Sequence, residues 1–440
     1  MVEPRVIPRA EHSVSRRDID PDALKVLYRL RQFDHIAYLV GGSVRDLLLG
    51  RRPKDFDIGT SAHPYQVKKL FRNCWIIGRR FRLAHVKFGP KTVEVATFRR
   101  QVQPGEEVVQ DGVPAPDPTE PAGELLIHRD NTFGTPEEDA FRRDFTINAL
   151  FYDIATFSII DYVGGLEDLR AGIVRSIGDP DVRFREDPVR MMRAVALAAR
   201  LGFTIDEPVV EAIGRHRHEI AASSPPRLLE EYYKILRSGA AERTFRALAA
   251  AGLLEPISTE LHEGAADPLW RALAEIDAYR GRFETIPETL TNPILLGTLL
   301  VPLGLRPHDG HREPARPRPE DGTAEGARRP GPRLGELPLA RRDVERLRQL
   351  LGLQRRLREV GAGQRAQRGL VHRSSFRDAL TWLEIHGGAA DVTEHWAALA
   401  ASGAPAEAAE AAGQPPPGPR RRRRRRRRRG PRKDHPTTEQ

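Results

Sequence analysis

Near residue 165 the hydrophobic pattern of this 440-residue chain changes from a mixed pattern to a helical one. Before that point, an apolar run at 36–40 and alternating segments at 55–60 and 91–98 predict strands, with helix-spaced residues between them. After it, helical spacing continues to about residue 402. The change predicts an α+β chain, in which a head with a small mixed sheet precedes an all-helical region.

Composition divides the chain further. The first residues are polar and lack an apolar period, and a stretch rich in Pro, Arg, Gly and Glu within the helical region has the composition of disorder. We expect, in order, a flexible leader at 1–21, the head at 22–165, a helical neck at 166–240, a helical body at 241–305, a disordered insert at 306–335, the continued helical body at 336–402 and a disordered Arg-rich tail at 403–440.

The net charge of the chain, +10, is a property of its tail. Residues 415–440 hold 12 Lys and Arg against two acids, so the rest of the chain is neutral. The ten-arginine run at 420–429 cannot pack and must be solvated or lie along a polyanion. We expect it to bind RNA or DNA phosphates without reading sequence; a solubilising tail or an acidic protein partner are the alternatives.

Cysteine content and apolar length indicate the compartment. The single cysteine, Cys74, allows no internal disulfide and fits a reducing environment. The longest apolar stretch, 293–305, is too short and too interrupted by Pro and Gly to span a bilayer, and the N-terminus lacks the apolar core of a signal peptide. We therefore expect a cytoplasmic protein with no membrane partner.

Two aspartates in the alternating segment 55–60 are candidate metal ligands. On a strand, Asp55 and Asp57 would face the same side with their Cα atoms about 7 Å apart, and their oxygens suit Mg²⁺. Glu94, on the segment 91–98, could add a third carboxylate. Such a cluster fits a two-metal in-line displacement at phosphorus, whereas a solvated turn is the alternative reading.

A glycine pair follows the first predicted strand. Gly41 and Gly42 lie between the strand and a helix start, a shape that presents backbone N–H groups to phosphate. Arg45 could fork onto phosphate oxygens. An ordinary tight turn between strand and helix is the alternative.

A third candidate segment begins a helix in the predicted neck. Asp187 is a suitable N-cap and Pro188 a suitable first helical residue. Arg190 and Arg193 are three residues apart and therefore share one face of that helix.

Four segments in order resemble one known family. They read LVGGSVRDLLLGRRPKDFDIGTSA (39–62), RRDFTINAL (142–150), REDPVRMMRAVALAARLGF (185–203) and PPRLLEEYYKIL (225–236). They resemble the signature of the nucleotidyltransferases that add CCA to tRNA or poly(A) to RNA, members of the polymerase-β-like superfamily. The resemblance covers roughly residues 24–240.

The resemblance implies roles for the matching positions. It implies ATP as substrate and a two-Mg²⁺ site, and the implied residues are Asp55, Asp57 and Asp144 for catalysis; Asp55, Asp57 and Glu94 for the metals; Gly41, Gly42 and Arg45 for the triphosphate; Arg143 for a nucleotide contact; and Asp187 and Arg190, supported by Arg193, for the edge of the base. One position departs from the family, because Ala196 stands where the family usually has an arginine.

Within the family, two features favour the bacterial poly(A) polymerase branch. The stretch at 71–90, with IIGRRFRLAHV, is similar to an element that marks this branch, and so is the Arg-rich tail. We therefore expect template-independent addition of AMP from ATP to RNA 3′-hydroxyl ends, with release of pyrophosphate and without sequence specificity for the RNA. CCA addition to tRNA is the first alternative. A catalytically inactive RNA-binding protein on the same fold is the second, although all four acids are present.

Overall fold

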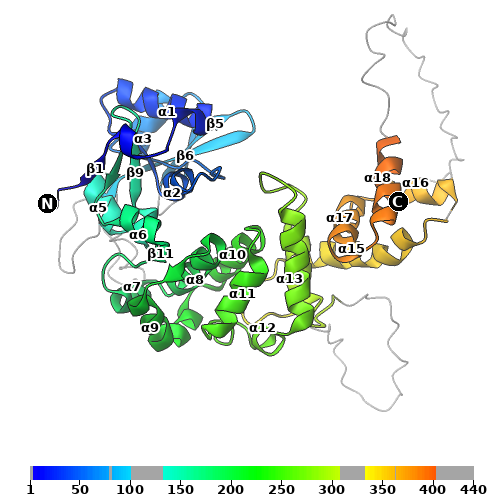
Figure 1. Cartoon of the computed structure of the whole chain (residues 1–440). Helices are drawn as coiled ribbons and strands as arrows, with labels where there is room; N and C mark the ends of the chain where they lie inside the picture. Colours follow the sequence, from blue (N-terminus) through cyan, green and yellow to red (C-terminus); the bar gives the residue numbers. More distant parts are fainter. Residues whose placement is uncertain (1–2, 79–81, 101–131, 308–331, 362, 403–440) are drawn as a thin grey trace, which may run out of the picture.

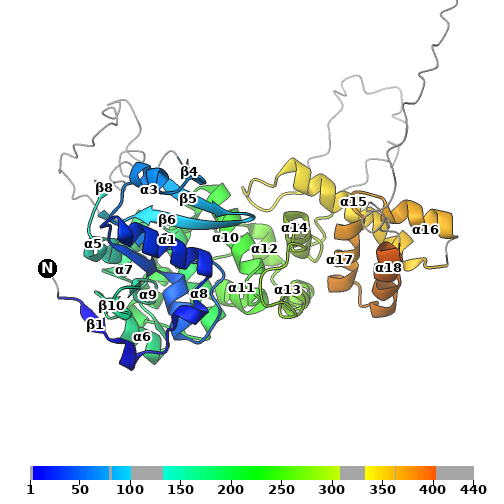
Figure 2. The ribbon, with the colours of Figure 1, turned by 90° about the horizontal axis from the view of Figure 1, so that it is seen from above.

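The computed structural model describes residues 3–78, 82–100, 132–307, 332–361 and 363–402 (Figure 1). In both ribbon views the head and the last helices lie at opposite ends, joined by the neck (Figure 2). The Arg-rich tail and most of the expected insert lie outside the described residues. The α+β class is confirmed.

The head is built on one mixed sheet. Its strands run in the order β1 (Arg5–Ile7), β10 (Ser158–Asp161), β9 (Leu150–Asp153), β2 (Ala37–Val40), β3 (Ile58–Thr60), β6 (Lys91–Thr97), β5 (Leu83–Phe88) and β4 (Cys74–Ile77). Neighbouring strands are antiparallel except β3 and β6, which are parallel with Ile58 opposite Val95. Helices α1 (Pro21–Gln32) and α3 (Pro64–Leu70) pack on the sheet, and Leu27, Leu30 and Leu39 are fully buried there.

The segment expected to be a flexible leader is part of the head. Its strand β1 pairs with β10, and Ile7, Val14 and Ile19 are buried in the head's core. These three apolar residues are separated by short 3₁₀ turns, so they form no period that a sequence pattern could reveal.

The strand expected at 55–60 is shorter than its alternation suggests. β3 begins at Ile58, so Asp55 and Asp57 precede it in irregular backbone. The ladder ends because β2 stops at Val40, whose N–H makes the last hydrogen bond, to the Asp57 carbonyl, before the chain turns at Gly41. The prediction that strand pleating aligns the two carboxylates is therefore wrong; their placement comes from the turn.

The neck is mostly helical. Its helices are α6 (Gly165–Ala171), α7 (Pro180–Glu186), α8 (Val189–Leu201), α9 (Glu207–His216) and α10 (Pro225–Leu236). Two strands, β11 (Ile173–Val174) and β12 (Thr204–Ile205), pair in parallel within it. Two-residue strands carry no detectable alternation, so the expected all-helical neck missed them.

The body continues as a helical array. It comprises α11 (Ala241–Ala250), α12 (Thr259–Glu263), α13 (Asp267–Arg280), α14 (Asn292–Leu300), α15 (Arg341–Arg358), α16 (Gln364–Val371), α17 (Phe376–His386) and α18 (Ala390–Ser402). α14 is buried from Pro293 to Leu300 between its neighbours α13 and α15. Leu334 is also buried, and the Gly335 N–H donates to Glu260, so the last residues of the expected insert pack on the body. Across the described ranges, none of the helices is both long and apolar enough to cross a membrane.

Candidate active site

The glycine turn joins β2 to helix α2 (Gly42–Leu48). Gly41 has φ +72°, which side chains rarely adopt, and an added Cβ would lie 3.0 Å from Nη1 of Arg143. Its N–H donates to the carbonyl of Leu150 on β9. The turn therefore brings the backbone of the glycine pair against the guanidinium of Arg143.

The three predicted acidic residues lie near one another beside this turn. β3 and β6 run in parallel with Ile58 opposite Val95. Asp57 and Glu94 come directly before these two residues and are therefore neighbours as well. Desolvation, with the charges of Glu94 and Asp55, raises the pKa of Asp57 to about 6, against an opposing effect of Arg143 and Lys54. Lys54 lies 3.1 Å from Asp55, and His85 lies 3.5 Å from Glu94. The cluster holds more negative charge than its neighbours neutralise.

The donor chemistry of this cluster fits Mg²⁺. Carboxylate oxygens are the ligands that this hard cation prefers, and a cation would offset both the burial and the repulsion that raise the pKa of Asp57. Within the part of the chain that the structure describes, however, no three His, Cys, Asp or Glu side chains already meet in metal-binding geometry. Asp55, Asp57 and Glu94 are therefore close in space but not preassembled around an ion.

Arg143 is held in place by a buried carboxylate. Nε and Nη2 donate to Asp139, which also accepts from Arg142 and from the Arg99 N–H. Burial opposes ionisation of Asp139, but the two arginines outweigh it and lower its pKa. The Arg143 side chain keeps 20% of its surface exposed. It therefore stands as a fixed, accessible cation between the glycine turn and the acid cluster.

Asp144 faces a different direction from the acid cluster. One carboxylate oxygen accepts from the Phe145 N–H and Asn148, and the other lies 2.7 Å from Nη2 of Arg193 on α8. Burial would raise the pKa of Asp144, but Arg193 and these hydrogen bonds lower it. The structure thus brings Asp144 and Arg193 together, as an ion pair between head and neck, while none of the described contacts of Asp144 reaches Asp55, Asp57 or Glu94.

Asp187 and Arg190 lie at the start of α8. The expected N-cap is wrong by one residue: Pro188 occupies the N-cap position, while Asp187 ends α7 with extended backbone. The Asp187 side chain makes no cap because one oxygen accepts from Arg227, whereas the other is buried without a hydrogen-bond partner in the structure. Arg190 donates to Glu186 and to the Arg183 carbonyl.

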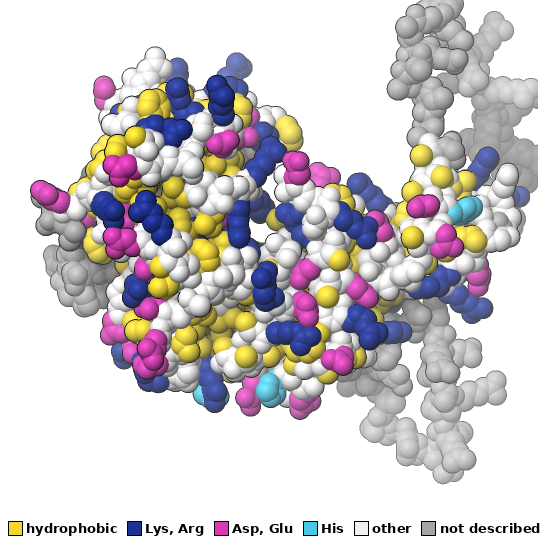
Figure 3. Space-filling model, viewed as in Figure 1, with side chains coloured by type: hydrophobic (Ala, Val, Ile, Leu, Met, Phe, Trp, Pro, Cys, Tyr) yellow, Lys and Arg dark blue, Asp and Glu magenta, His cyan; other side chains and the backbone are white. Residues whose placement is uncertain are grey.

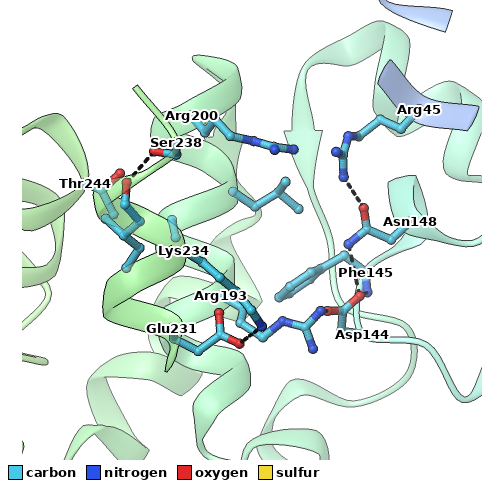
Figure 4. Close-up of a pocket in the computed structure, with 13 residues that line it drawn as sticks. Arg45, Asp144, Phe145, Asn148, Arg193, Arg200, Glu231, Lys234, Ser238 and Thr244 are labelled. Atoms are coloured by element: carbon cyan, nitrogen blue, oxygen red, sulfur yellow. Dashed lines mark hydrogen bonds and ion pairs between the residues drawn. The ribbon is translucent and has the colours of Figure 1, made fainter. Parts of the chain in front are cut away.

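A pocket of about 230 Å³ lies between head and neck (Figure 4). Arg45, Asp144 and Arg193 line it, together with Asn148, Arg200, Glu231 and Lys234. Arg45 is buried, and its guanidinium donates to Asp46 and Asn148. These contacts hold the Arg45 guanidinium against Asp46 and Asn148 while its side chain still lines the pocket, and its expected contact with phosphate stays a prediction.

Asn148, which no sequence argument singled out, links the turn to the pocket. Its carbonyl accepts from Arg143, and its side-chain amide contacts both Arg45 and Asp144. Arg200 and Lys234 were missed as well. Arg200 lies one helical turn after Ala196 and lines the same pocket, so the i, i+4 spacing was the available signal.

The sequence of this chain matches family models and relatives from one group of proteins. Three family models match: "Poly A polymerase head domain" over residues 37–175, "Probable RNA and SrmB- binding site of polymerase A" over 202–264, and "Polymerase A arginine-rich C-terminus" over 333–430. Poly(A) polymerase I of Escherichia coli O6:H1 is 48% identical over 276 residues, covering 62% of this chain and 58% of the relative. The CCA-adding enzyme of Lactobacillus helveticus is 39% identical over 218 residues, covering 50% of each chain.

Solved structures show the same architecture. The CCA-adding enzyme of Bacillus stearothermophilus in complex with CTP aligns with a TM-score of 0.52 and 25% identity, covering 87% of this chain and 84% of that one. The mixed sheet, helical neck and helical body thus define a nucleotidyltransferase fold. The chain belongs to the family of tRNA nucleotidyltransferases and poly(A) polymerases. It spans 58% of the length of its Escherichia coli relative.

Proposed function

We propose that this chain is a template-independent poly(A) polymerase that transfers AMP from ATP to RNA 3′-hydroxyl ends and releases pyrophosphate. The observation that carries the proposal is the repulsive acid cluster of Asp55, Asp57 and Glu94 beside the glycine turn. The Mg²⁺ that accompanies a nucleotide would supply the positive charge that this cluster lacks. The greater identity to poly(A) polymerase I than to CCA-adding enzymes supports AMP addition.

Asp55, Asp57 and Glu94 are the residues that would hold Mg²⁺. The bound ions would lower the pKa of the attacking hydroxyl and stabilise charge on the departing pyrophosphate. The chain's own part is positioning: Gly41 and Gly42 let the backbone approach the triphosphate, and Arg143, fixed by Asp139, places a cation beside it. The 3′-hydroxyl oxygen then bonds to the α-phosphorus as the bond to pyrophosphate breaks.

The pocket between head and neck would receive the nucleotide. Its lining carries four cations, Arg45, Arg193, Arg200 and Lys234, against the two acids Asp144 and Glu231. Asp46, which pairs with Arg45 and lies 3.8 Å from Arg200, lowers this excess to one positive charge, which still suits a polyphosphate. We propose that Arg200 and Lys234 supply the charge that the family's arginine would bring at Ala196. Asp144 acts here through Arg193, as a positioning residue rather than as a metal ligand.

Asp187 and Arg190 would read the base. Adenine presents an amino donor beside a ring-nitrogen acceptor, whereas guanine and uracil present a carbonyl acceptor at the matching place. The buried, unpartnered oxygen of Asp187 can accept from such an amino group, and Arg190 can donate to the ring nitrogen. Cytosine shares this donor–acceptor pattern, so discrimination against CTP depends on pocket shape.

RNA would be the partner. We propose that RNA 3′ ends bind without sequence specificity and that the tail at 403–440, outside the described residues, grips RNA phosphates. Polyadenylation of cytoplasmic RNA is the process that such an enzyme serves.

Primer extension tests the proposal against its alternatives. A labelled RNA of arbitrary sequence is incubated with Mg²⁺ and each of ATP, CTP, GTP and UTP separately. The proposal predicts long ladders with ATP alone. Two or three additions that need CTP and a tRNA lacking its end would establish CCA addition instead, which the likeness to the CTP-bound structure keeps as the second candidate. No extension with intact RNA binding would indicate an inactive RNA-binding protein.

A further inference from the structure

A second cavity, of about 440 Å³, lies in the C-terminal helices, far from the head. It opens between α15 and the residues that lead into α17, and three arginines, Arg348, Arg356 and Arg373, line it. Figures 1 and 2 both place these helices at the opposite end of the described molecule from the sheet. The cavity therefore takes no part in the chemistry proposed for the head.

The charge of this cavity is unbalanced. Arg348 pairs with Glu345 at 2.6 Å, but neither Arg356 nor Arg373 has a side-chain hydrogen bond or ion pair recorded among the described residues. No Asp or Glu belongs to the cavity's lining. Lys and Arg side chains are also visible over this end of the molecule in Figure 3. Two guanidinium groups thus face a hollow without an acidic partner.

The start of α17 adds hydrogen-bond donors to the same hollow. Ser375 lines the cavity at the N-cap position, is 6% exposed, and its hydroxyl makes no hydrogen bond to the first turn. α17 has 11 residues, and the first N–H groups of a helix lack intrahelical partners. Asp378 in that first turn is already neutralised by Arg346 at 2.6 Å. The Phe376 N–H is already used, because it donates to the Arg373 carbonyl. The Ser375 hydroxyl and the guanidinium groups of Arg356 and Arg373 therefore remain as donors in a lining that holds no carboxylate.

We propose that this cavity, formed by Arg356, Arg373 and Ser375, binds a backbone phosphate of the RNA upstream of its 3′ end. Guanidinium forks and N–H groups match phosphate oxygens. The lining contains no aromatic side chain on which a base could stack, so it fits a phosphate better than a whole nucleotide. The inference rests on the proposed RNA substrate and names a second anchor for it.

The distance between cavity and head predicts a dependence on RNA length. A short primer that fills only the head cannot reach α15, whereas a long single strand can contact both ends. The double variant Arg356→Ala/Arg373→Ala should therefore weaken binding of long RNA by about tenfold and leave the short primer unaffected. Loss of the contact with this one phosphate should also reduce the slope of log K against log salt by about 0.7.

The test measures RNA affinity of the full chain at several salt concentrations, which needs no catalysis. Arg342→Ala/Arg355→Ala is the charge-matched control, because both residues lie on α15, are 95% and 90% exposed, and stand outside the cavity. Equal loss in both double variants, or no loss in either, would overturn the site. Unchanged thermal midpoints would show that both variants fold.

Inorganic phosphate presents the same oxygens to the cavity as a backbone phosphate of RNA. The cavity would be a small-anion site if inorganic phosphate raised the thermal midpoint of the parent chain but not that of Arg356→Ala/Arg373→Ala, while both proteins bound RNA equally well. That result would contradict the RNA proposal. If the parent chain extends no primer, the proposed activity is wrong. The RNA affinities of the parent chain and the two double variants still test the cavity in that case.

Discussion

Asp144 of the head and Arg193 of helix α8 form an ion pair of 2.7 Å across the boundary between head and neck. Asp144 keeps 8% of its side chain exposed, and Asn148 and the Phe145 N–H donate to the carboxylate oxygen that does not face Arg193. The pair lines the pocket proposed for the nucleotide. Stability of the chain and geometry of the pocket therefore depend on the same contact.

Asp144→Asn should destabilise the fold by about 2–3 kcal/mol, because it leaves Arg193 without its buried partner. The pKa of Asp144 is lowered in the folded chain, so its stabilisation is present above its ordinary value of 3.8 and is lost as pH falls below it. Chemical denaturation should thus show a constant difference between parent and variant at pH 6–8 that shrinks below about pH 4.

Arg52→Ala is the control, since it removes an exposed head-to-body ion pair with Glu284 and should cost less than about 1 kcal/mol. Equal effects of the two substitutions would show that the Asp144–Arg193 contact is no stronger than a surface pair.

Asp57 should make the metal-free protein less stable at neutral pH. Its pKa rises from 3.8 to about 6 on folding, so the folded state binds more protons between these values. Stability should therefore fall as pH rises through that window, and Asp57→Asn should be more stable than the parent at pH 8 but equal to it below pH 4. Thermal unfolding of the parent and of Asp57→Asn at each pH measures this difference in stability.

Mg²⁺ should restore the stability that the charge of Asp57 removes, and it should do so in the parent chain only. It should raise the thermal midpoint of the parent at pH 8 and leave Asp57→Asn unchanged. Asp18→Asn, which removes an exposed acid elsewhere in the head, should respond as the parent does. A Mg²⁺ response that survives in Asp57→Asn would place the ion elsewhere.

Arg200→Ala should separate nucleotide binding from stability. Burial, with the charge of Arg45, lowers the pKa of Arg200, so removal of this cation should not lower the thermal midpoint. It should weaken ATP binding about tenfold, because the pocket loses one of its charge-assisted contacts to phosphate. Arg271→Ala, an exposed cation on α13, is the control. A lower midpoint with unchanged ATP affinity would make Arg200 a structural residue.

Asp187→Asn should relax selection of the base. Replacing the unpartnered acceptor oxygen by an amide lets the side chain donate as well as accept, so the kcat/KM ratio of ATP to GTP should fall about tenfold. Arg227→Ala removes the neighbour of Asp187 without changing its acceptor and should alter this ratio less. An unchanged ratio in Asp187→Asn would remove it from base reading.

Local signals predicted those parts of the fold that local chemistry determines. The glycine pair separates β2 from α2 as expected, and Thr135 and Glu138 form a capping box, a local motif, at α5 (Pro136–Phe141). Strand β1 was missed, because three residues paired through distant β10 leave no periodic trace. Its pairing depends on contacts more than a hundred residues apart along the chain.

The candidate site also combines residues that the sequence indicates with contacts that only the fold produces. Residue types and order identified the acids, but the inward position of Arg45 and the ion pair of Asp144 depend on Asn148 and α8, which only the fold brings near them. The i, i+4 spacing of Arg200 from Ala196 is visible in the sequence, but only the fold shows that both residues line one pocket.

Primer extension by acid-cluster variants tests the central claim most directly. Asp55→Ala and Asp57→Ala are compared with Asp18→Ala, which removes an exposed acid of the head, on one labelled RNA with ATP and Mg²⁺. The account predicts that both cluster variants lose extension while their RNA affinity and that of the control stay near the parent value. Long ladders from either cluster variant would contradict the assignment of nucleotidyl transfer to this cluster.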